Sequence, residues 1–192
     1  MNDDHAKLIT GLVKWFDPAK GYGFILDSDG GADVLLHANV LRNFGRSSVA
    51  DNARMVVRAH VTARGIQATE VVEIWAPEGD GTPPIADLGQ DVIENLDQLP
   101  LHAARVKWFD KQKGFGFANV FGQSDDVFIH IEVLRQSGFS DLTIGEAVAL
   151  RLFQGARGLI AAQVLAWDAA ITGDAAAQDA GYCNGSDENA AL

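Results

Sequence analysis

One stretch of this sequence occurs twice. Residues 13–45, VKWFDPAKGYGFILDSDGGADVLLHANVLRNFG, return as residues 106–138, VKWFDKQKGFGFANVFGQSDDVFIHIEVLRQSG, with 16 of 33 positions identical at a constant offset of 93 residues. A repeat that served only a hydrophobic core would repeat mainly apolar residues. Here the identical positions include aromatic rings, lysines, a histidine and glycines. This combination is typical of a surface on which bases stack while phosphates are neutralised nearby.

The repeat divides the 192 residues into two small domains. We assign residues 1–76 and 103–168 to these domains, residues 77–102 to an acidic linker and residues 169–192 to a disordered acidic tail. The hydrophobic fraction of 47% is ordinary for a globular protein, so neither domain is expected to need a disulfide or a metal ion. No cofactor is expected.

The net charge of −11 is concentrated outside the two domains. Residues 1–76 and 103–168 carry net charges of −1 and 0, whereas the linker carries −6 and the tail −4. Near-neutral domains can still gather lysines on one surface. The acidic composition therefore does not exclude nucleic acid as a partner.

The sequence favours a cytoplasmic location. Cys183 is the only cysteine, so the chain forms no internal disulfide and is typical of a reducing compartment. The start, MNDDHAKLIT, lacks the apolar run of a secretory signal, and no later segment approaches the roughly 20 apolar residues of a membrane span. No interaction with a membrane is expected.

Short alternating apolar runs separated by turn residues predict five strands in each domain. They are expected near residues 8–16, 22–26, 33–37, 54–63 and 66–75, and near residues 103–109, 115–120, 126–130, 147–153 and 159–167. The connection between the third and fourth strands is long in both copies. The predicted fold class is therefore all-β, with two five-stranded OB-fold barrels in tandem.

Strand alternation predicts an aromatic surface on each barrel. Tyr22 and Phe24 lie two residues apart and share a face, and in the third strand Val34 and Leu36 form the natural core pair, which turns His37 outward. Lysines at the entrance to the second strand are placed to meet phosphates. The predicted first platform is Trp15, Tyr22, Phe24 and His37 with Lys20, and the second is Trp108, Phe115, Phe117, Phe128 and His130 with Lys113.

Isolated aromatic residues more often fill a core. Against that interpretation, Gly21 and Gly23 alternate with the rings and leave no bulky opposite face, and the third strand already supplies core residues. The exposed interpretation is therefore preferred.

Metal binding and catalysis are weaker interpretations. His37 and His130 each lack a neighbouring histidine or cysteine that would complete a metal site. Asp29 with Asp33, and the pair at 125–126, could suggest a two-metal nuclease, but they lie where a hairpin turn needs polar residues. No nucleophile recurs together with a base, so an enzyme is not predicted.

The linker contains an amphipathic stretch. Residues 87–99 place Leu88, Val92, Leu96 and Leu99 on one helical face, with acids elsewhere. Two interpretations are open. The stretch is either a solvated spacer with a marginal helix or a short helix that docks on a barrel, joining the domains or shielding a platform.

Three motifs in each repeat resemble those of the bacterial cold-shock domain family. Residues 14–17 (KWFD), 20–25 (KGYGFI) and 33–37 (DVLLH) resemble that family's KWFN, KGFGFI and DVFVH, and the second copy has KWFD at 107–110, KGFGFA at 113–118 and DVFIH at 126–130. The resemblance covers about 140 of the 192 residues. It implies OB barrels that bind single-stranded RNA and DNA, with RNA-chaperone or antitermination activity, and two copies in one chain resemble double-domain cold-shock proteins.

The resemblance adds expected nucleic-acid contacts at Lys14, Phe16, Lys107, Phe109 and Phe139. Alternation with Trp15 and Trp108 would turn the phenylalanines at 16 and 109 inward unless a bulge intervenes.

The two copies depart from the family pattern unequally. Leu35 stands where the family usually has a phenylalanine that the second copy keeps, and Arg46 stands where the second copy has Phe139. Ala38 and Ile131 replace another frequent phenylalanine. Stacking is not expected at these four substituted positions.

The predicted function is single-strand binding by base stacking, as an RNA chaperone or a regulator of transcription or translation. The alternative is an OB-fold protein-interaction module with the acidic linker as its docking element.

Overall fold

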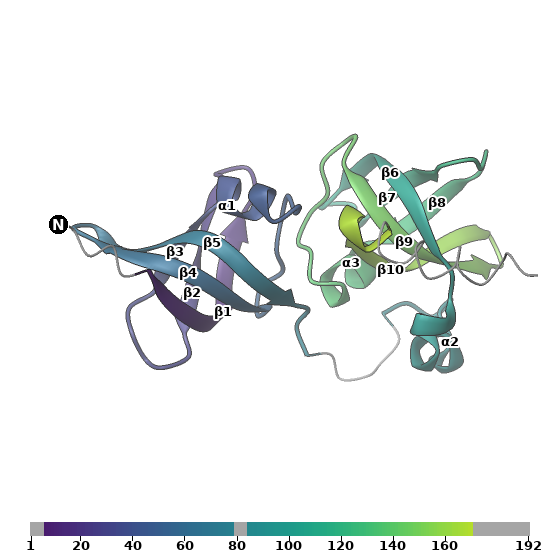
Figure 1. Cartoon of the computed structure of the whole chain (residues 1–192). Coiled ribbons are helices and arrows are strands. Elements are labelled where there is room, and N and C mark those ends of the chain that lie inside the picture. The colour runs from purple at the N-terminus through teal and green to yellow at the C-terminus, as the bar shows by residue number, and fades with distance from the viewer. Residues whose placement is uncertain (1–5, 79–83, 171–192) are drawn as a thin grey trace, which may run out of the picture.

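The computed structural model describes residues 6–78 and 84–170, which form two barrels joined by the linker (Figure 1). The tail predicted to be disordered lies, from residue 171 onward, outside the described residues, as does Cys183. No helix in the described part of the chain has the length and apolar character to cross a membrane.

Each barrel has five strands, with a short helix directly after the third. The first contains β1 (Lys7–Asp17), β2 (Tyr22–Asp27), β3 (Val34–His37), α1 (Ala38–Asn43), β4 (Arg54–Thr62) and β5 (Gly65–Trp75). The second contains β6 (Leu101–Asp110), β7 (Phe115–Val120), β8 (Asp126–His130), α3 (Ile131–Gln136), β9 (Ala147–Gly155) and β10 (Gly158–Ala166). The strands close in the orders β1-β2-β3-β5-β4 and β10-β8-β7-β6-β9. The prediction of two five-stranded barrels in tandem is confirmed.

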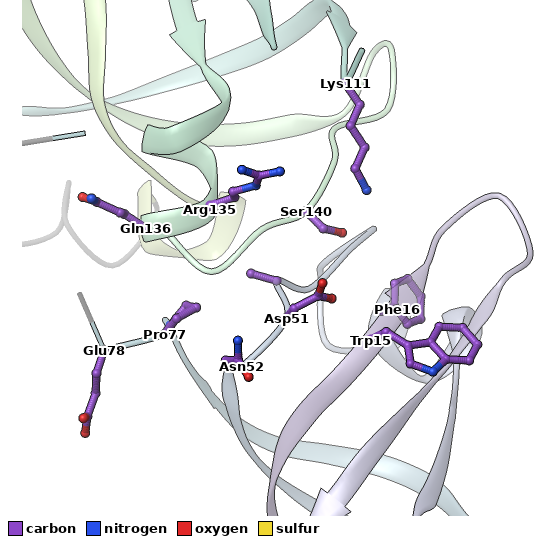
Figure 2. A pocket seen from close by; sticks show the side chains of 11 residues that line it. Trp15, Phe16, Asp51, Asn52, Pro77, Glu78, Lys111, Arg135, Gln136 and Ser140 are labelled. Atoms are coloured by element: carbon purple, nitrogen blue, oxygen red, sulfur yellow. The ribbon is translucent and has the colours of Figure 1, made fainter. Parts of the chain in front are cut away.

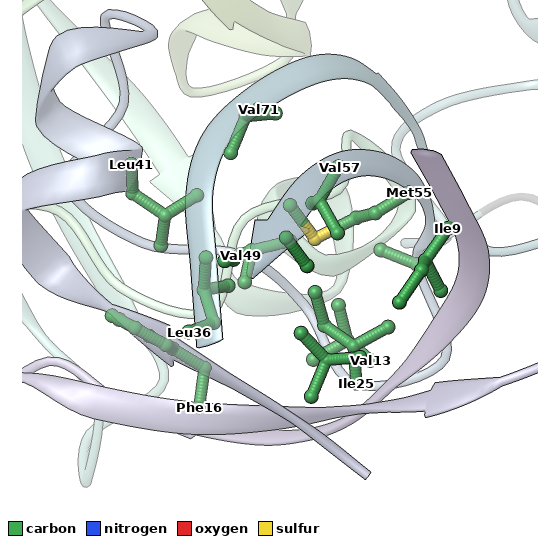
Figure 3. Close-up of a cluster of buried hydrophobic side chains, with 14 of the residues drawn as sticks. Ile9, Val13, Phe16, Ile25, Leu36, Leu41, Val49, Met55, Val57 and Val71 are labelled. Carbon is green, nitrogen blue, oxygen red and sulfur yellow. The ribbon is translucent and has the colours of Figure 1, made fainter. Parts of the chain in front are cut away.

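Alternating side chains fill each barrel. In the first, Val13, Ile25, Val34 and Leu36 are fully buried and pack with residues from β4 and β5 (Figure 3). Because successive residues of a strand point to opposite faces, burying these positions exposes their neighbours on β2 and β3. The core thus fixes which side chains reach the outer surface.

The short helices α1 and α3 were not predicted. Each begins directly after the histidine that ends the third strand, and each buries a leucine, Leu41 or Leu134, completely. Six residues are too few to display a helical period, so tertiary packing rather than sequence pattern determines these turns.

The linker packs against the second barrel. It contains α2 (Gln90–Glu94) and a 3-10 turn (Leu96–Gln98). Leu88 is 1% exposed and Val92 is buried, and both lie in one cluster with Val133 of α3 and Ala162 of β10.

Corresponding loops of the two barrels contact each other. The Ser48 hydroxyl donates to the Asp141 carbonyl oxygen at 2.6 Å and accepts from the Asp141 amide at 3.0 Å. The Ala50 amide donates to the Gly138 carbonyl at 2.9 Å. Residues 45–50 and 138–143 are related by the repeat offset, so the duplicated loop packs against its own copy.

Candidate nucleic-acid interface

A bulge in the first strand of each barrel brings two successive side chains to the outer surface. The register of β1 with β2 shifts between Val13 and Trp15, which leaves Lys14 as the extra residue. Val13 is fully buried, so in a regular strand Trp15, two residues later, would also point inward. The bulge instead exposes Lys14 and Trp15 together. In the second barrel a shift between Val106 and Trp108 has the same effect.

A glycine opposite each bulge makes this geometry possible. Gly23 pairs with Phe16, and a Cβ atom at position 23 would overlap the Trp15 carbonyl oxygen and lie 2.7 Å from the Phe16 Cα. Gly116 meets the corresponding atoms of Trp108 and Phe109. Glycine therefore permits the bulged strand to approach its neighbour closely.

The first platform gathers three rings. The centroid of Trp15 lies 5.5 Å from those of Tyr22 and Phe24, and the latter two are 6.3 Å apart with nearly perpendicular planes. All three side chains are partly exposed. In the register of β2 with β3, Tyr22 pairs with His37 and Phe24 with Leu35, so an aliphatic side chain occupies the centre of the third strand.

The second platform gathers four rings and a histidine. Trp108, Phe115 and Phe117 repeat the first arrangement, with centroids 5.4 to 6.3 Å apart. Phe128 adds a ring 5.7 Å from Phe115 at an interplanar angle of 28°, and His130 lies 6.3 Å from Phe128. The second platform therefore offers more aromatic surface than the first.

The turn before the second strand presents a lysine beside each platform. The Asp17 carboxylate accepts from the backbone amides of Ala19 and Lys20, and the Lys20 ammonium lies 3.6 Å from it. Asp110 and Lys113 repeat this turn with a separation of 3.7 Å. Lys113 also lies 6.0 Å from the Trp108 ring centroid.

The lysines on the bulges are paired as well. Lys14 lies 3.1 Å from Asp33 and Lys107 lies 2.8 Å from Asp126, with both lysine side chains half exposed. Exposed ion pairs of this kind contribute about 0–1 kcal/mol. A phosphate can therefore replace either carboxylate at small cost.

Hydrogen bonds lower the pKa of three aspartates beside the lysines, Asp17, Asp110 and Asp126. The backbone amide of Lys20 lowers the pKa of Asp17, and that of Lys113 lowers the pKa of Asp110. The Lys107 ammonium lowers the pKa of Asp126. The stability from these bonds is present above the carboxyl's ordinary pKa and is lost as pH falls through the lowered value. These three aspartates therefore keep their negative charge beside the lysines at neutral pH.

The two histidines are held differently. His130 is partly buried, and its Nδ1 accepts from the Glu132 amide at 3.2 Å, which caps α3. His37 is exposed and makes no such cap. His130 therefore has a fixed ring orientation beside Phe128, whereas the His37 ring is not held by a cap.

Burial corrects the expected contacts at Phe16 and Phe139. Phe16 is 4% exposed and faces the first core, because the bulge displaces Lys14 and leaves residue 16 pointing inward. Phe139 is 1% exposed in the second core, and the Arg46 guanidinium lies 4.3 Å from its ring centroid. Neither ring can stack on a base in this structure. Phe109 is partly buried against the second core.

Burial lowers the pKa of Arg46 to about 10, and the Asp168 carboxylate opposes this change. The guanidinium over Phe139 is therefore charged at neutral pH.

Within residues 6–78 and 84–170, no group of three histidine, cysteine or acidic side chains has the arrangement of a metal site.

Comparison with known proteins identifies the same two regions. The family profile described as 'Cold-shock' DNA-binding domain matches residues 9–74 and 102–167. The cold shock-like protein CspG of Shewanella violacea is 44% identical over 61 residues, which are 32% of this chain and 87% of that protein. The cold shock protein CspA of Staphylococcus aureus is 45% identical over 60 residues, 31% of this chain and 89% of that protein.

Among solved structures, the chain is similar to drosophila Unr CSD456 with a TM-score of 0.31 and 14% identity. That alignment covers 83% of this chain and 60% of the other. The score is too low to relate the arrangement of domains in the two proteins.

Proposed function

Because the chain belongs to the cold-shock domain family, with one domain copy in each half, we propose that it binds single-stranded RNA and DNA by base stacking on both platforms. Through this binding it acts as an RNA chaperone or as a regulator of transcription or translation. The cytoplasm is the proposed location, consistent with a sequence that contains one cysteine.

The observation that carries the proposal is the pairing of ring clusters with lysines on both barrels. Partly exposed rings 5.4 to 6.3 Å apart offer faces and edges to successive bases. Lys14, Lys20, Lys107 and Lys113 border these rings. Because every base has a π-face, such a surface binds with little sequence selectivity.

Tryptophan fluorescence tests this function. Replacing Trp75 and Trp167 by phenylalanine leaves Trp15 and Trp108 as reporters, one on each platform. We expect single-stranded oligonucleotides to quench their emission, and the matching duplex to do so far less. Absence of binding to any single strand would favour the protein-interaction alternative, and magnesium-stimulated cleavage of labelled RNA would favour a nuclease.

Stacking is expected to contribute more than charge. Phe117→Ala should weaken single-strand binding by the second platform about 10-fold, since base–ring stacking is worth about 1–3 kcal/mol. Lys113→Ala should weaken it less at moderate salt, because Lys113 already shares its charge with Asp110. Fluorescence anisotropy of one short labelled strand compares the two variants. A larger loss from the lysine change would show that binding is chiefly electrostatic.

We extend the proposal to the acidic linker, which we infer lowers the affinity of the second platform. Asp87 lines a pocket with Phe117, Phe128 and Arg157 at the edge of this platform. Asp97 instead pairs with Arg151 at 3.6 Å. Asp87, on the segment leading into α2, is therefore the linker carboxylate placed to compete with phosphate at the second platform.

Asp87→Asn should tighten single-strand binding about 2-fold at low salt, and the gain should shrink as salt screens the charge. Asp91→Asn is the matched control, because it removes the same charge from an exposed position of α2 that does not line this pocket. Titrations at two salt concentrations measure both variants. Affinities of both variants equal to that of the unmodified protein would make the linker charge irrelevant to binding, and equal tightening by both would contradict the specific role of Asp87.

A further inference from the structure

A groove runs between the two barrels. Its lining includes Trp15 and Asn52 from the first barrel and Lys111, Arg135 and Ser140 from the second. Trp15 belongs to the first platform, and Lys111 lies in the turn that also carries Lys113 of the second. The groove therefore connects the edge of one platform to the basic turn of the other.

The two walls of the groove differ in chemistry. Figure 2 shows Lys111 and Arg135 reaching into it from the second barrel, with Trp15, Asp51 and Asn52 on the opposite side. One wall thus offers cations, and the other offers an aromatic ring together with carboxylate and amide groups. Cations attract phosphates, whereas rings and short polar side chains suit base faces and base edges.

Two groups on the second-barrel wall have unused bonding capacity. Lys111 is exposed and has no ion pair within the described residues. The Ser140 hydroxyl is buried beside the groove and has no hydrogen-bond partner there. Arg135 is held 2.7 Å from Glu132, so it contributes less free charge than Lys111.

The contact between the duplicated loops forms one end of this groove. Ala50 and Ser140 line it, and their backbone amides donate to Gly138 and to the Ser48 hydroxyl, respectively. Arg46 adds the stacked contact with Phe139. Hydrogen bonds between the barrels thereby help to set the width of the groove.

We propose that this groove binds the segment of a single strand that passes from the first platform to the second. The phosphates lie against Lys111 and Arg135, and the bases face Trp15 and Asn52. The proposal rests on the proposed function, because the strand must first bind the platforms. A strand bound in the groove would join the two platforms into one continuous binding site, in place of two separate sites on a tethered pair of barrels.

Strand length and Lys111 test this proposal in the full chain. Anisotropy titrations use labelled oligothymidylates of about 6 and about 20 nucleotides, lengths that fit one OB fold and both. The long strand gains affinity from tethering alone, so this gain is not diagnostic. We expect Lys111→Ser to lower the ratio of long-strand to short-strand affinity about 5- to 10-fold, the order expected for one charge-assisted contact.

The salt dependence gives a second readout. Losing one phosphate contact should reduce the salt slope for the long strand by about 0.7, with a smaller change for the short strand. Lys7→Ser is the matched control, because it removes one lysine charge from the exposed start of β1, away from the groove lining and from the platform end of that strand. This control should leave both affinities unchanged.

The outcomes separate the two proposals. If both strands bind and Lys111→Ser gives the same affinity ratio and salt slope as Lys7→Ser, the groove proposal is overturned and the platform function stands. If neither strand binds the unmodified protein, both fail. A ratio and slope that fall only in the Lys111 variant support the groove.

Discussion

Phe128→Leu should weaken single-strand binding by the second platform about 10-fold, and Leu35→Phe should strengthen binding by the first. Phe128 pairs with Phe117 across β7 and β8 and stacks on Phe115 at 28°. Leu35 occupies the same register position in the first barrel and offers no ring. Because stacking is worth about 1–3 kcal/mol per base, the ring of Phe128 is expected to make the second platform bind a single strand more tightly than the first.

The comparison requires one active platform at a time in the full chain, because the barrels contact each other and the linker packs on the second. Alanine at Trp15, Tyr22 and Phe24 together disables the first platform, and alanine at Trp108, Phe115 and Phe117 together disables the second, since each lost ring removes about 1–3 kcal/mol of stacking. A short labelled strand, which fits one barrel, is titrated into each background with and without the exchange at position 35 or 128. Equal affinities of the two platforms, or a stronger first platform, would contradict the inequality.

The sequence predicted the strands and most of the platform because alternation is a local property. The buried pair Val34 and Leu36 correctly turned Leu35 and His37 outward. The same rule fails for Trp15, which lies two residues from buried Val13 and is exposed only through the bulge at Lys14. The signal for the bulge was present as Gly23, the residue whose missing side chain accommodates it.

Contacts between distant segments were beyond prediction. The expectation that Phe139 binds nucleic acid came from its place in the loop, but the structure buries it beneath Arg46, 93 residues earlier. Docking of the linker stretch on a barrel was one of two open interpretations, but its contact between Leu88 and Val133 could not be read from the sequence. Lys111 carried no signal, because its role in the groove depends on the first barrel lying opposite.

The largest expected loss of stability is at the glycines opposite the bulges. Gly23→Ala and Gly116→Ala should each lower the free energy of unfolding of their barrel by about 2–3 kcal/mol, the upper part of the range for overpacking a core. The added Cβ would overlap the carbonyl oxygen of the platform tryptophan, and a second clash, 2.7 Å from the Cα of Phe16 or Phe109, also involves backbone. Backbone atoms held in a β-ladder cannot move aside as a side chain can.

Gly31→Ala supplies the control for this prediction. The atoms nearest its new Cβ belong to the side chain of Asp27, not to backbone, and a side chain can rotate away; Gly31 also has no positive φ. Urea unfolding followed by circular dichroism compares the variants, and Trp15 emission, isolated by phenylalanine at the other three tryptophans, reports on the first bulge. If Gly23→Ala unfolds at the same urea concentration as Gly31→Ala, the bulge is not constrained as argued. If it unfolds earlier and the Trp15 emission shifts in the folded state, the residue that permits the fold also positions the ring on which a base is proposed to stack.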